Sequence, residues 1–188
     1  SYHDMGLIGG VLQPLYMGRT NILMSPMAFL QKPFRWLSAI SRFGATTSGG
    51  PNFAYDLCVR KITAEQRERL DLSSWKLAFN GAEPINPETL DRFAKMFEPC
   101  GFCPESFYPC FGLAEATLIV SGGQMEEKSV VRCFDSAALA ENRAVRVDRA
   151  NRRSTSIVGC GCTLPDQEIV IADPKTLERC NDGQVGEI

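Results

Sequence analysis

Short apolar segments alternate with longer amphipathic segments over the first two thirds of the chain. The short segments have the length and make-up of buried strands, and they are residues 45–48, 77–79 and 106–108. The segments between them carry apolar side chains at three- and four-residue spacing, which predicts helices at residues 33–44, 51–62 and 86–97. Short strands that alternate with such helices predict an α/β fold with a mostly parallel sheet flanked by helices.

Further segments extend this prediction toward both ends of the chain. Apolar residues recur every three or four positions over residues 5–16, which predicts a helix with one buried face. The run Ile22–Met24 predicts a short buried strand, and Ser25-Pro26 predicts the start of a short helix. Thr63–Gln66 has the pattern of a capping box, which predicts another helix start.

The last third of the sequence is rich in short β-like segments. We predict strands at residues 130–134, 144–147, 157–158, 168–171 and 185–188. Asn181-Asp182-Gly183 has the composition of a hairpin turn. We therefore expect an α/β subdomain over residues 1–123, and the start of a β-rich, barrel-like subdomain over residues 154–188.

Composition excludes several functional classes. The formal charge of −2 gives no electrostatic reason for binding nucleic acid or an anionic membrane surface. No apolar run reaches the roughly 20 residues that a membrane-spanning helix needs. The first residues do not resemble a secretory signal, so we expect a cytoplasmic protein. The chain also starts inside a motif and ends on strand-like residues, so we expect it to be part of a longer protein.

The eight cysteines include two close pairs, Cys100/Cys103 and Cys160/Cys162. A structural zinc site needs four ligands, and the only histidine, His3, is far from both pairs in the sequence. Free thiols in a reducing compartment are therefore favoured over a metal site.

Three glycine-bearing loops follow the three predicted strands. They are Ser48-Gly49-Gly50, Asn80-Gly81-Ala82-Glu83 and Cys110-Phe111-Gly112. The carboxyl ends of parallel strands meet at one edge of the sheet, where ligands of such folds bind. We therefore expect the three loops to converge on one site.

Residues 105–118 hold an aromatic ring, a glycine and a carboxylate close together, at Phe111, Gly112 and Glu115. A ring can stack on a base, a glycine permits close approach of the backbone, and a carboxylate binds a hard cation such as Mg²⁺. The pattern thus predicts a nucleotide and Mg²⁺ site. Each residue also has an ordinary structural alternative: Phe111 in the core, and Glu115 as a surface carboxylate in the first turn of a helix.

Other candidates have structural alternatives as well. The structural alternative for Tyr108 is the end of a strand, and that for the His3-Asp4 pair is a helix cap. Glu83 is harder to explain structurally, because Gly81-Ala82-Glu83-Pro84 predicts an exposed turn after a strand.

Four blocks of the sequence resemble, in order, the motifs of the adenylate-forming superfamily, and more narrowly the fatty acyl-AMP ligases. The blocks are Tyr2-His3-Asp4-Met5-Gly6-Leu7-Ile8-Gly9-Gly10, Ser48-Gly49-Gly50-Pro51-Asn52-Phe53-Ala54, Asn80-Gly81-Ala82-Glu83-Pro84 and Tyr108-Pro109-Cys110-Phe111-Gly112-Leu113-Ala114-Glu115-Ala116-Thr117. They follow one another in order between residues 2 and 117. The resemblance implies the large N-terminal domain of such an enzyme, of which this chain would be an internal fragment.

The resemblance implies a ligase that condenses a fatty acid with ATP into acyl-adenylate and pyrophosphate. It would then transfer the acyl group to the phosphopantetheine thiol of an acyl carrier protein serving polyketide or peptide synthesis. The implied nucleotide-binding residues are Asn80, Gly81, Ala82, Glu83, Pro84, Tyr108, Phe111, Gly112, Leu113 and Ala114. The implied acyl-pocket residues are Met5, Gly6, Ser48, Gly49 and Gly50. Glu115 would bind Mg²⁺, and His3 would be the catalytic residue where the carboxylate and thiol approach.

Two departures from the family accompany this resemblance. Ala114 stands where many members carry a phosphate-binding threonine. The chain also lacks the family's phosphate loop, ribose-binding aspartate and lysine-bearing lid, so we expect the isolated chain to have no ligase activity and to bind ATP weakly. Residues 124–153 fall where fatty acyl-AMP ligases carry an insertion that disfavours coenzyme A.

Two other functions remain open from the sequence. One is a coenzyme A-linked acyl synthetase, and the other is a non-catalytic docking module of a polyketide or peptide synthase. A dinucleotide-binding domain of the Gly-x-Gly-x-x-Gly type is disfavoured, because no such motif follows a predicted strand.

Overall fold

The computed structural model describes residues 3–125 and 127–188. Its main sheet has the strand order β1-β2-β3-β4-β7. The strands are β1 (Thr47–Gly50), β2 (Leu77–Asn80), β3 (Phe107–Leu113), β4 (Leu118–Gly122) and β7 (Cys162–Thr163). The first three are parallel, and β4 and β7 are antiparallel additions. The predicted α/β fold with a mostly parallel sheet is confirmed.

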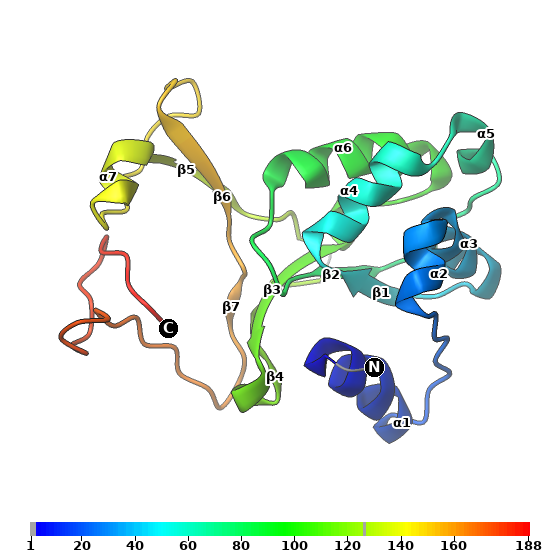
Figure 1. Ribbon diagram of the computed structural model, residues 1–188, viewed down its shortest axis with the longest axis horizontal. Helices are drawn as coiled ribbons and strands as arrows, with labels where there is room; N and C mark the ends of the chain where they lie inside the picture. Colours follow the sequence, from blue (N-terminus) through cyan, green and yellow to red (C-terminus); the bar gives the residue numbers. More distant parts are fainter. Residues whose placement is uncertain (1–2, 126) are drawn as a thin grey trace.

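Helices lie on both sides of this sheet. One side is covered by α4 (Asn52–Lys61) and α6 (Pro87–Phe97), and the other by the N-terminal helix (Figure 1). That helix consists of a π-helical segment, η1 (Met5–Leu12), and a final α-helical turn, α1 (Gln13–Tyr16). The remaining short helices are α2 (Pro26–Gln31), α3 (Phe34–Phe43), α5 (Ala64–Arg67), η2 (Glu98–Cys100), η3 (Pro104–Ser106) and η4 (Ala114–Ala116).

The helix boundaries follow from local sequence signals. The Asn86 side chain accepts a hydrogen bond from the Glu88 N–H, and Pro87 occupies the first turn of α6. Thr63 and Gln66 form the reciprocal bonds of a capping box at the start of α5. The predicted helix starts at Ser25, Thr63 and Asn86 are therefore confirmed.

An aromatic cluster fills the space between the helices and the sheet. Its buried rings are Tyr55, Trp75, Phe93, Phe97, Phe102 and Phe107. Most neighbouring rings meet edge to face, at centroid distances of 5.0–6.1 Å for the pairs of Phe93 with Tyr55, Trp75, Phe102 and Phe107 and of Phe102 with Phe107.

Two of these rings also bond to strand carbonyls. The Tyr55 hydroxyl donates to the Phe79 carbonyl at 2.8 Å. The Trp75 indole N–H lies 3.1 Å from the Ser48 carbonyl and 3.0 Å from the Leu77 carbonyl. The apolar core therefore fixes the ends of β1 and β2 through hydrogen bonds as well as through packing.

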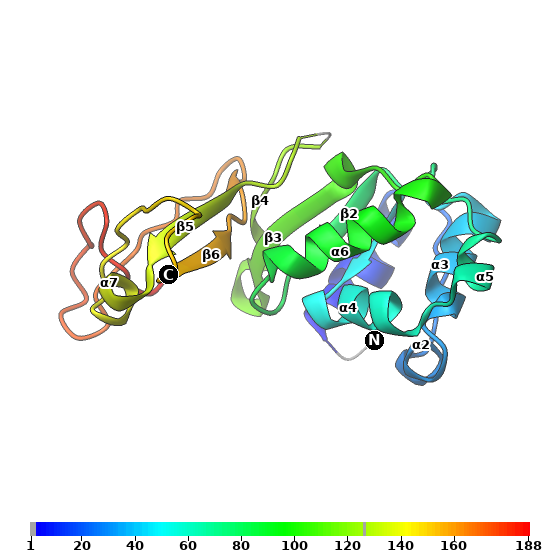
Figure 2. The same ribbon diagram turned by 90° about the horizontal axis from the view of Figure 1, so that it is seen from above.

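A two-stranded ribbon projects from the α/β body (Figure 2). It pairs β5 (Val131–Asp135) with β6 (Ser154–Val158), and α7 (Ser136–Ala140) follows β5 directly. Val158 is buried in the core cluster, and Val131 packs against the same cluster. This contact anchors the base of the ribbon on the body.

Gly161 joins the ribbon to the main sheet between β6 and β7. Its φ of +78° lies in the left-handed region, and a Cβ there would overlap the carbonyl group of Gly122. On Gly122 itself a Cβ would overlap the Tyr108 hydroxyl. Gly122 is thus enclosed by Tyr108 and Gly161, and neither glycine position has space for a side chain.

Several predicted strands are wrong. Ile22–Met24 is irregular and exposed, since no neighbouring strand pairs with it. No strand forms at residues 144–147, 168–171 or 185–188, where there are only isolated bridges in or beside each segment. A strand needs several consecutive residues paired with a neighbour, and here only single positions are paired. The turn at residues 181–183 is present, closed by the Gln184 N–H on the Asn181 carbonyl at 3.0 Å.

Phe107–Leu113 continues as strand through the Phe111–Gly112 motif, so this strand is longer than predicted. Tyr2, which opens the first motif block, lies outside the described residues. Among the described helices, none is long and apolar enough to cross a membrane.

Replacement of a central ring tests the role of the aromatic cluster. Phe93 is fully buried, so Phe93→Ala should lower the free energy of unfolding by about 3–5 kcal/mol because a cavity replaces the ring. Phe43→Ala is the control, since Phe43 is 53% exposed and should cost at most about 0.5 kcal/mol. Urea denaturation followed by tryptophan fluorescence measures both. Equal destabilisation by the two variants would contradict this account of the core.

Candidate functional site

A cavity of about 690 Å³ lies between the N-terminal helix and the main sheet. It is lined by nine of the predicted site residues: His3, Met5, Gly81, Ala82, Tyr108, Phe111, Gly112, Leu113 and Ala114. These residues come from the N-terminal helix, the loop after β2, and the end of β3. Two of the three predicted glycine loops therefore converge on one cavity.

A tight hairpin forms the wall that contains Phe111 and Gly112. The β3–β4 register shifts between these two residues, and η4 connects the strands. A Cβ on Gly112 would overlap the Leu118 carbonyl, so only glycine permits this approach of the two strands. Leu118 itself has a φ of +86°, which shows how sharply the backbone turns back. The half-buried Phe111 ring is held at the cavity wall by this turn.

The loop after β2 forms the neighbouring wall. Gly81 is buried, and a Cβ there would lie 2.8 Å from the Cys110 carbonyl oxygen. Ala82 has a φ of +65°, an unusual conformation for a residue with a side chain. The loop is thus pressed against β3, and its backbone lines the cavity.

Asn80, at the end of β2, is fully buried. Within the described residues, neither its amide nitrogen nor its side-chain oxygen has a hydrogen-bond partner. A buried amide without partners is costly, by about 1–3 kcal/mol. Asn80 is not among the residues that line the cavity. Its neighbour Phe79 does line it, so alternation along β2 puts the Asn80 side chain on the other face of the strand.

His3 and Asp4 lie at the start of the N-terminal helix, at the edge of the cavity. The His3 Nδ1 atom contacts the Asp4 carboxylate, and both side chains receive the Met5 N–H, at 3.2 and 2.8 Å. His3 is 68% exposed. The pair therefore caps the helix and also presents an imidazole at the cavity, so both interpretations from the sequence are compatible with the structure.

Eight predicted site residues lie outside the lining of this cavity: Gly6, Ser48, Gly49, Gly50, Asn80, Glu83, Pro84 and Glu115. The Ser48 hydroxyl accepts a hydrogen bond from the Trp36 indole N–H at 2.9 Å, and Gly49 lies against the Phe79 ring. Glu115 is exposed on η4, just beyond the cavity wall. The acyl-pocket role of Ser48–Gly50 and the metal role of Glu115 remain predictions.

The cavity also contains residues that the sequence reasoning missed. They include Gln13 from the N-terminal helix and Thr47, Leu77, Phe79 and Ile119 from the strands. Ile8, Gly9 and Cys110 also line the cavity, and they belong to motif blocks in which they have no predicted role. Leu77 and Phe79 are two positions apart on β2, as are Tyr108 and Cys110 on β3. Strict period-2 alternation would have assigned these four side chains to one face of the sheet.

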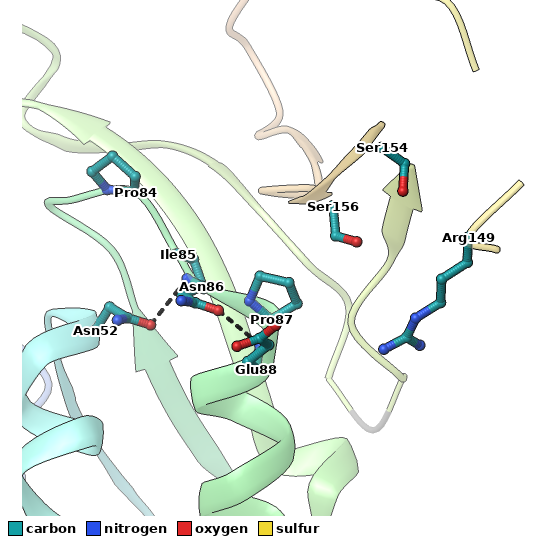
Figure 3. Close-up of a pocket in the computed structure, with 9 residues that line it drawn as sticks. All are labelled: Asn52, Pro84, Ile85, Asn86, Pro87, Glu88, Arg149, Ser154 and Ser156. Carbon is teal, nitrogen blue, oxygen red and sulfur yellow. Dashed lines mark hydrogen bonds between the residues drawn. The ribbon is translucent and has the colours of Figure 1, made fainter. Parts of the chain in front are cut away.

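A second cavity, of about 720 Å³, lies between the start of α6 and the ribbon (Figure 3). Pro84, Asn86 and Glu88 line it on one side, and Arg149, Ser154 and Ser156 line it on the other. Pro84 is thus the only predicted site residue on this lining.

All eight cysteines are free thiols in this structure. Among the described residues, no cluster of three or more histidine, cysteine or acidic side chains could hold a metal ion. Burial, supported by the neighbouring Cys160, raises the pKa of the Cys110 thiol to about 11. Burial also raises the pKa of the Tyr108 hydroxyl.

A family model described as AMP-binding enzyme matches residues 1–188. The chain belongs to the AMP-binding enzyme family. Two curated relatives are the medium-chain-fatty-acid–[acyl-carrier-protein] ligases TtuA of Teredinibacter turnerae and JamA of Moorena producens. They are 47% and 48% identical to this chain over its whole length, and the chain covers 29% and 32% of them. The chain thus spans about a third of the length of these family members.

Solved structures of this AMP-binding family agree with the fold. The fatty acid AMP ligase of Legionella pneumophila matches with a TM-score of 0.94 at 47% identity, over 98% of this chain and 32% of that chain. A second structure, the fatty acyl-adenylate ligase from L. pneumophila in complex with acyl adenylate and pyrophosphate, matches with a TM-score of 0.93 at 47% identity over the same shares of the two chains.

Glu83 has a structural role that can be tested. Its carboxylate accepts a hydrogen bond from the Phe53 N–H at 2.6 Å, in the first turn of α4, whose own N-cap residue is a proline. Glu83→Ala should therefore lower the free energy of unfolding by roughly 0.5–1 kcal/mol, as loss of a helix cap does. Glu83→Gln keeps an acceptor and should recover most of this in urea denaturation. An unchanged stability of the alanine variant would exclude the capping role.

Thiol reactivity tests the burial of Cys110. With a pKa of about 11, about a thousandth of this thiol is ionised at pH 8, and the ionised fraction rises tenfold per pH unit below the pKa. Because the thiolate is the nucleophile, the rate of modification follows this fraction. Iodoacetamide labelling followed by mass spectrometry should show slow modification of Cys110 that accelerates up to about pH 11. The exposed Cys162 is the internal control. Equal rates for the two thiols at pH 8 would contradict the prediction.

Proposed function

We propose that the whole protein containing this chain is a fatty acyl-AMP ligase. In the proposed reaction a fatty acid carboxylate attacks ATP to give acyl-adenylate and pyrophosphate. The acyl group then passes to the phosphopantetheine thiol of an acyl carrier protein. The observation that carries this proposal is the cavity walled by Phe111–Ala114 and Gly81–Ala82 in an AMP-binding chain whose relatives include acyl-carrier-protein ligases.

Each wall of the cavity has a proposed role in binding the adenylate. Phe111 stacks on the adenine, and the Gly81–Ala82 backbone covers the other face of the base. Gly112 and Leu113 bring main-chain groups close to the nucleotide. Asn80 ends β2 directly before this loop and keeps its proposed place among the nucleotide-binding residues. Ala114 contributes no hydroxyl to the phosphates.

The metal and acyl roles follow the same proposal. Glu115 is exposed next to the wall, so its carboxylate fits Mg²⁺, a hard cation that prefers oxygen ligands. The ion would neutralise phosphate charge during the first step. Met5 and Gly6, together with Ser48–Gly50, belong to the proposed acyl pocket, and His3 is placed where the carboxylate and thiol approach.

The proposed organisation of the chain keeps three parts: residues 1–123 with the site, an insertion at 124–153, and a β-rich start at 154–188. The insertion would disfavour coenzyme A as acceptor. The 188-residue chain by itself should have no ligase activity, because transition-state stabilisation needs charged groups that it does not contain. We place the protein in the cytoplasm, where its free thiols stay reduced.

A coenzyme A-linked synthetase is the second candidate. It is favoured by the putative fatty-acid–CoA ligase FadD21 of Mycobacterium tuberculosis, which is 39% identical over the whole of this chain. The two candidates differ in the acceptor of the second step. The whole protein, supplied with a fatty acid, ATP and Mg²⁺, should accumulate acyl-AMP even when coenzyme A is present. When the holo carrier protein is added, its phosphopantetheine thiol should become acylated. Release of acyl-CoA would favour the second candidate.

Replacement of Phe111 tests the nucleotide site. Phe111→Ala should weaken binding of a non-hydrolysable acyl-adenylate analogue roughly tenfold or more, since stacking on an aromatic ring contributes about 1–3 kcal/mol per base. Phe111→Tyr keeps the ring and should bind normally. Isothermal titration of the whole protein measures both, and unchanged affinity of the alanine variant would remove Phe111 from the proposed site.

A further inference from the structure

Positive charge is concentrated in one segment of the chain. Residues 141–153 contain five arginines and two acidic residues, a net charge of +3. The whole chain has a formal charge of −2, so the other residues together carry −5. A basic segment on an otherwise acidic protein indicates a local function rather than a general affinity for polyanions.

The backbone of this segment is fixed on the ribbon. The Asp135 N–H donates to the Val145 carbonyl at 2.9 Å, and the Val147 N–H donates to the Cys133 carbonyl at 3.0 Å. At the far end, the Ser136 N–H donates to the Arg153 carbonyl at 2.8 Å. Both ends of the basic segment are therefore tied to β5 and α7, and its arginines are displayed from an ordered backbone.

The pairing of β5 with β6 assigns side chains to two faces of the ribbon. Val131 pairs with Val158, and both pack toward the core of the body. The next pair, Arg132 with Ile157, must point to the opposite, outer face, and both residues are exposed. Arg146 bridges to Phe134, two positions along from Arg132, and therefore lies on the same outer face.

We call the exposed arginines of the ribbon and its loop the arginine surface: Arg132, Arg146, Arg149, Arg152 and Arg153. Among residues 3–125 and 127–188, none of these five takes part in an ion pair. In contrast, the neighbouring Arg143 pairs with Glu141 at 2.5 Å. Unpaired guanidinium groups leave a net positive charge on this part of the ribbon and its loop, and this charge attracts an acidic partner.

We propose that the arginine surface docks the acidic face of an acyl carrier protein, an inference that rests on the proposed function. Arginine is enriched in protein interfaces, and its planar fork matches the two oxygens of a carboxylate. Ile157 is 42% exposed and pairs with Arg132, which gives the surface the apolar component that protein interfaces also have.

The location of the surface suits a partner that must reach the cavity. β6 is separated from β7 by residues 159–161, and β7 pairs with β4. β4 in turn pairs with β3, which carries Phe111 and Gly112. The ribbon is a separate two-stranded sheet, and residues 159–161 link it through the chain to the sheet that carries the cavity wall.

Arg149 differs from the other arginines of the surface. It reaches into the recess beside α6, which Glu88 also lines (Figure 3). The Glu88 carboxylate on the same lining weakens the attraction of the Arg149 guanidinium for an acidic partner. We therefore assign the main docking contacts to Arg146, Arg152 and Arg153, and the test uses two of these.

Charge reversal of two arginines tests the proposal. Arg146→Glu/Arg152→Glu is compared with Arg19→Glu/Arg179→Glu, a control that changes exposed arginines elsewhere by the same total charge. The probe is a fluorescently labelled apo acyl carrier protein of the same organism, which lacks the pantetheine arm. Fluorescence anisotropy measures its affinity for the whole protein at low and at physiological salt. Circular dichroism melts establish that both variants are folded.

We expect the ribbon variant to bind the carrier protein at least about tenfold more weakly, with a reduced salt dependence, while the control binds normally. Arg146→Lys/Arg152→Lys keeps the charge and should retain most of the affinity. Equal affinities of the ribbon and control variants would overturn the proposal. Binding of anionic phosphatidylglycerol vesicles or of RNA with an affinity similar to that of the carrier protein, and lost in the ribbon variant, would also overturn it.

Acyl-AMP formation by the same proteins separates this inference from the proposed function. Normal acyl-AMP formation by the ribbon variant, with lost carrier binding, supports both. Normal acyl-AMP formation with unchanged carrier binding overturns the docking surface alone. Absence of acyl-AMP formation by the unmodified whole protein with every fatty acid tested, together with arginine-dependent carrier binding, would overturn the ligase and leave the carrier-binding surface supported.

Discussion

The hydrogen bonds that Tyr55 and Trp75 make to strand carbonyls determine where the site can form. Both rings are buried in the aromatic cluster, and they bond to carbonyl groups of β1 and β2 from the side of the sheet that α4 and α6 cover. The opposite side of the same strands is then available to the N-terminal helix and the cavity. Dense packing against one face of the sheet therefore makes the strands rigid, and these strands line the cavity on the opposite face, as preorganised binding sites require.

The cavity depends on backbone conformations more than on particular side chains. Gly112 permits the contact of β3 with Leu118, Gly81 permits the contact of the neighbouring loop with Cys110, and Ala82 adopts a positive φ. Strained backbone of this kind is commonly found at binding sites, where the surrounding structure stabilises it. Main-chain groups therefore form a large part of the cavity wall, next to the Phe111 ring.

Much of the fold, and part of the site, could be predicted from the sequence. Helix starts at Thr63 and Asn86 depend on side chains a few residues away, so local patterns were sufficient. The run Ile22–Met24 was misassigned because strand formation depends on a partner that composition does not reveal. The bond between Glu83 and the Phe53 N–H spans 30 residues, and no spacing rule could have indicated it.

The close fit of Gly161 against Gly122 has a consequence for how this molecule could be rebuilt. A side chain at either position would collide with its surroundings, so only glycine fits at residues 122 and 161, where the ribbon joins the sheet. The remainder of the ribbon contacts the body chiefly through Val131 and Val158. The ribbon could therefore be exchanged between homologous proteins, provided that the two glycines and the two valines are kept.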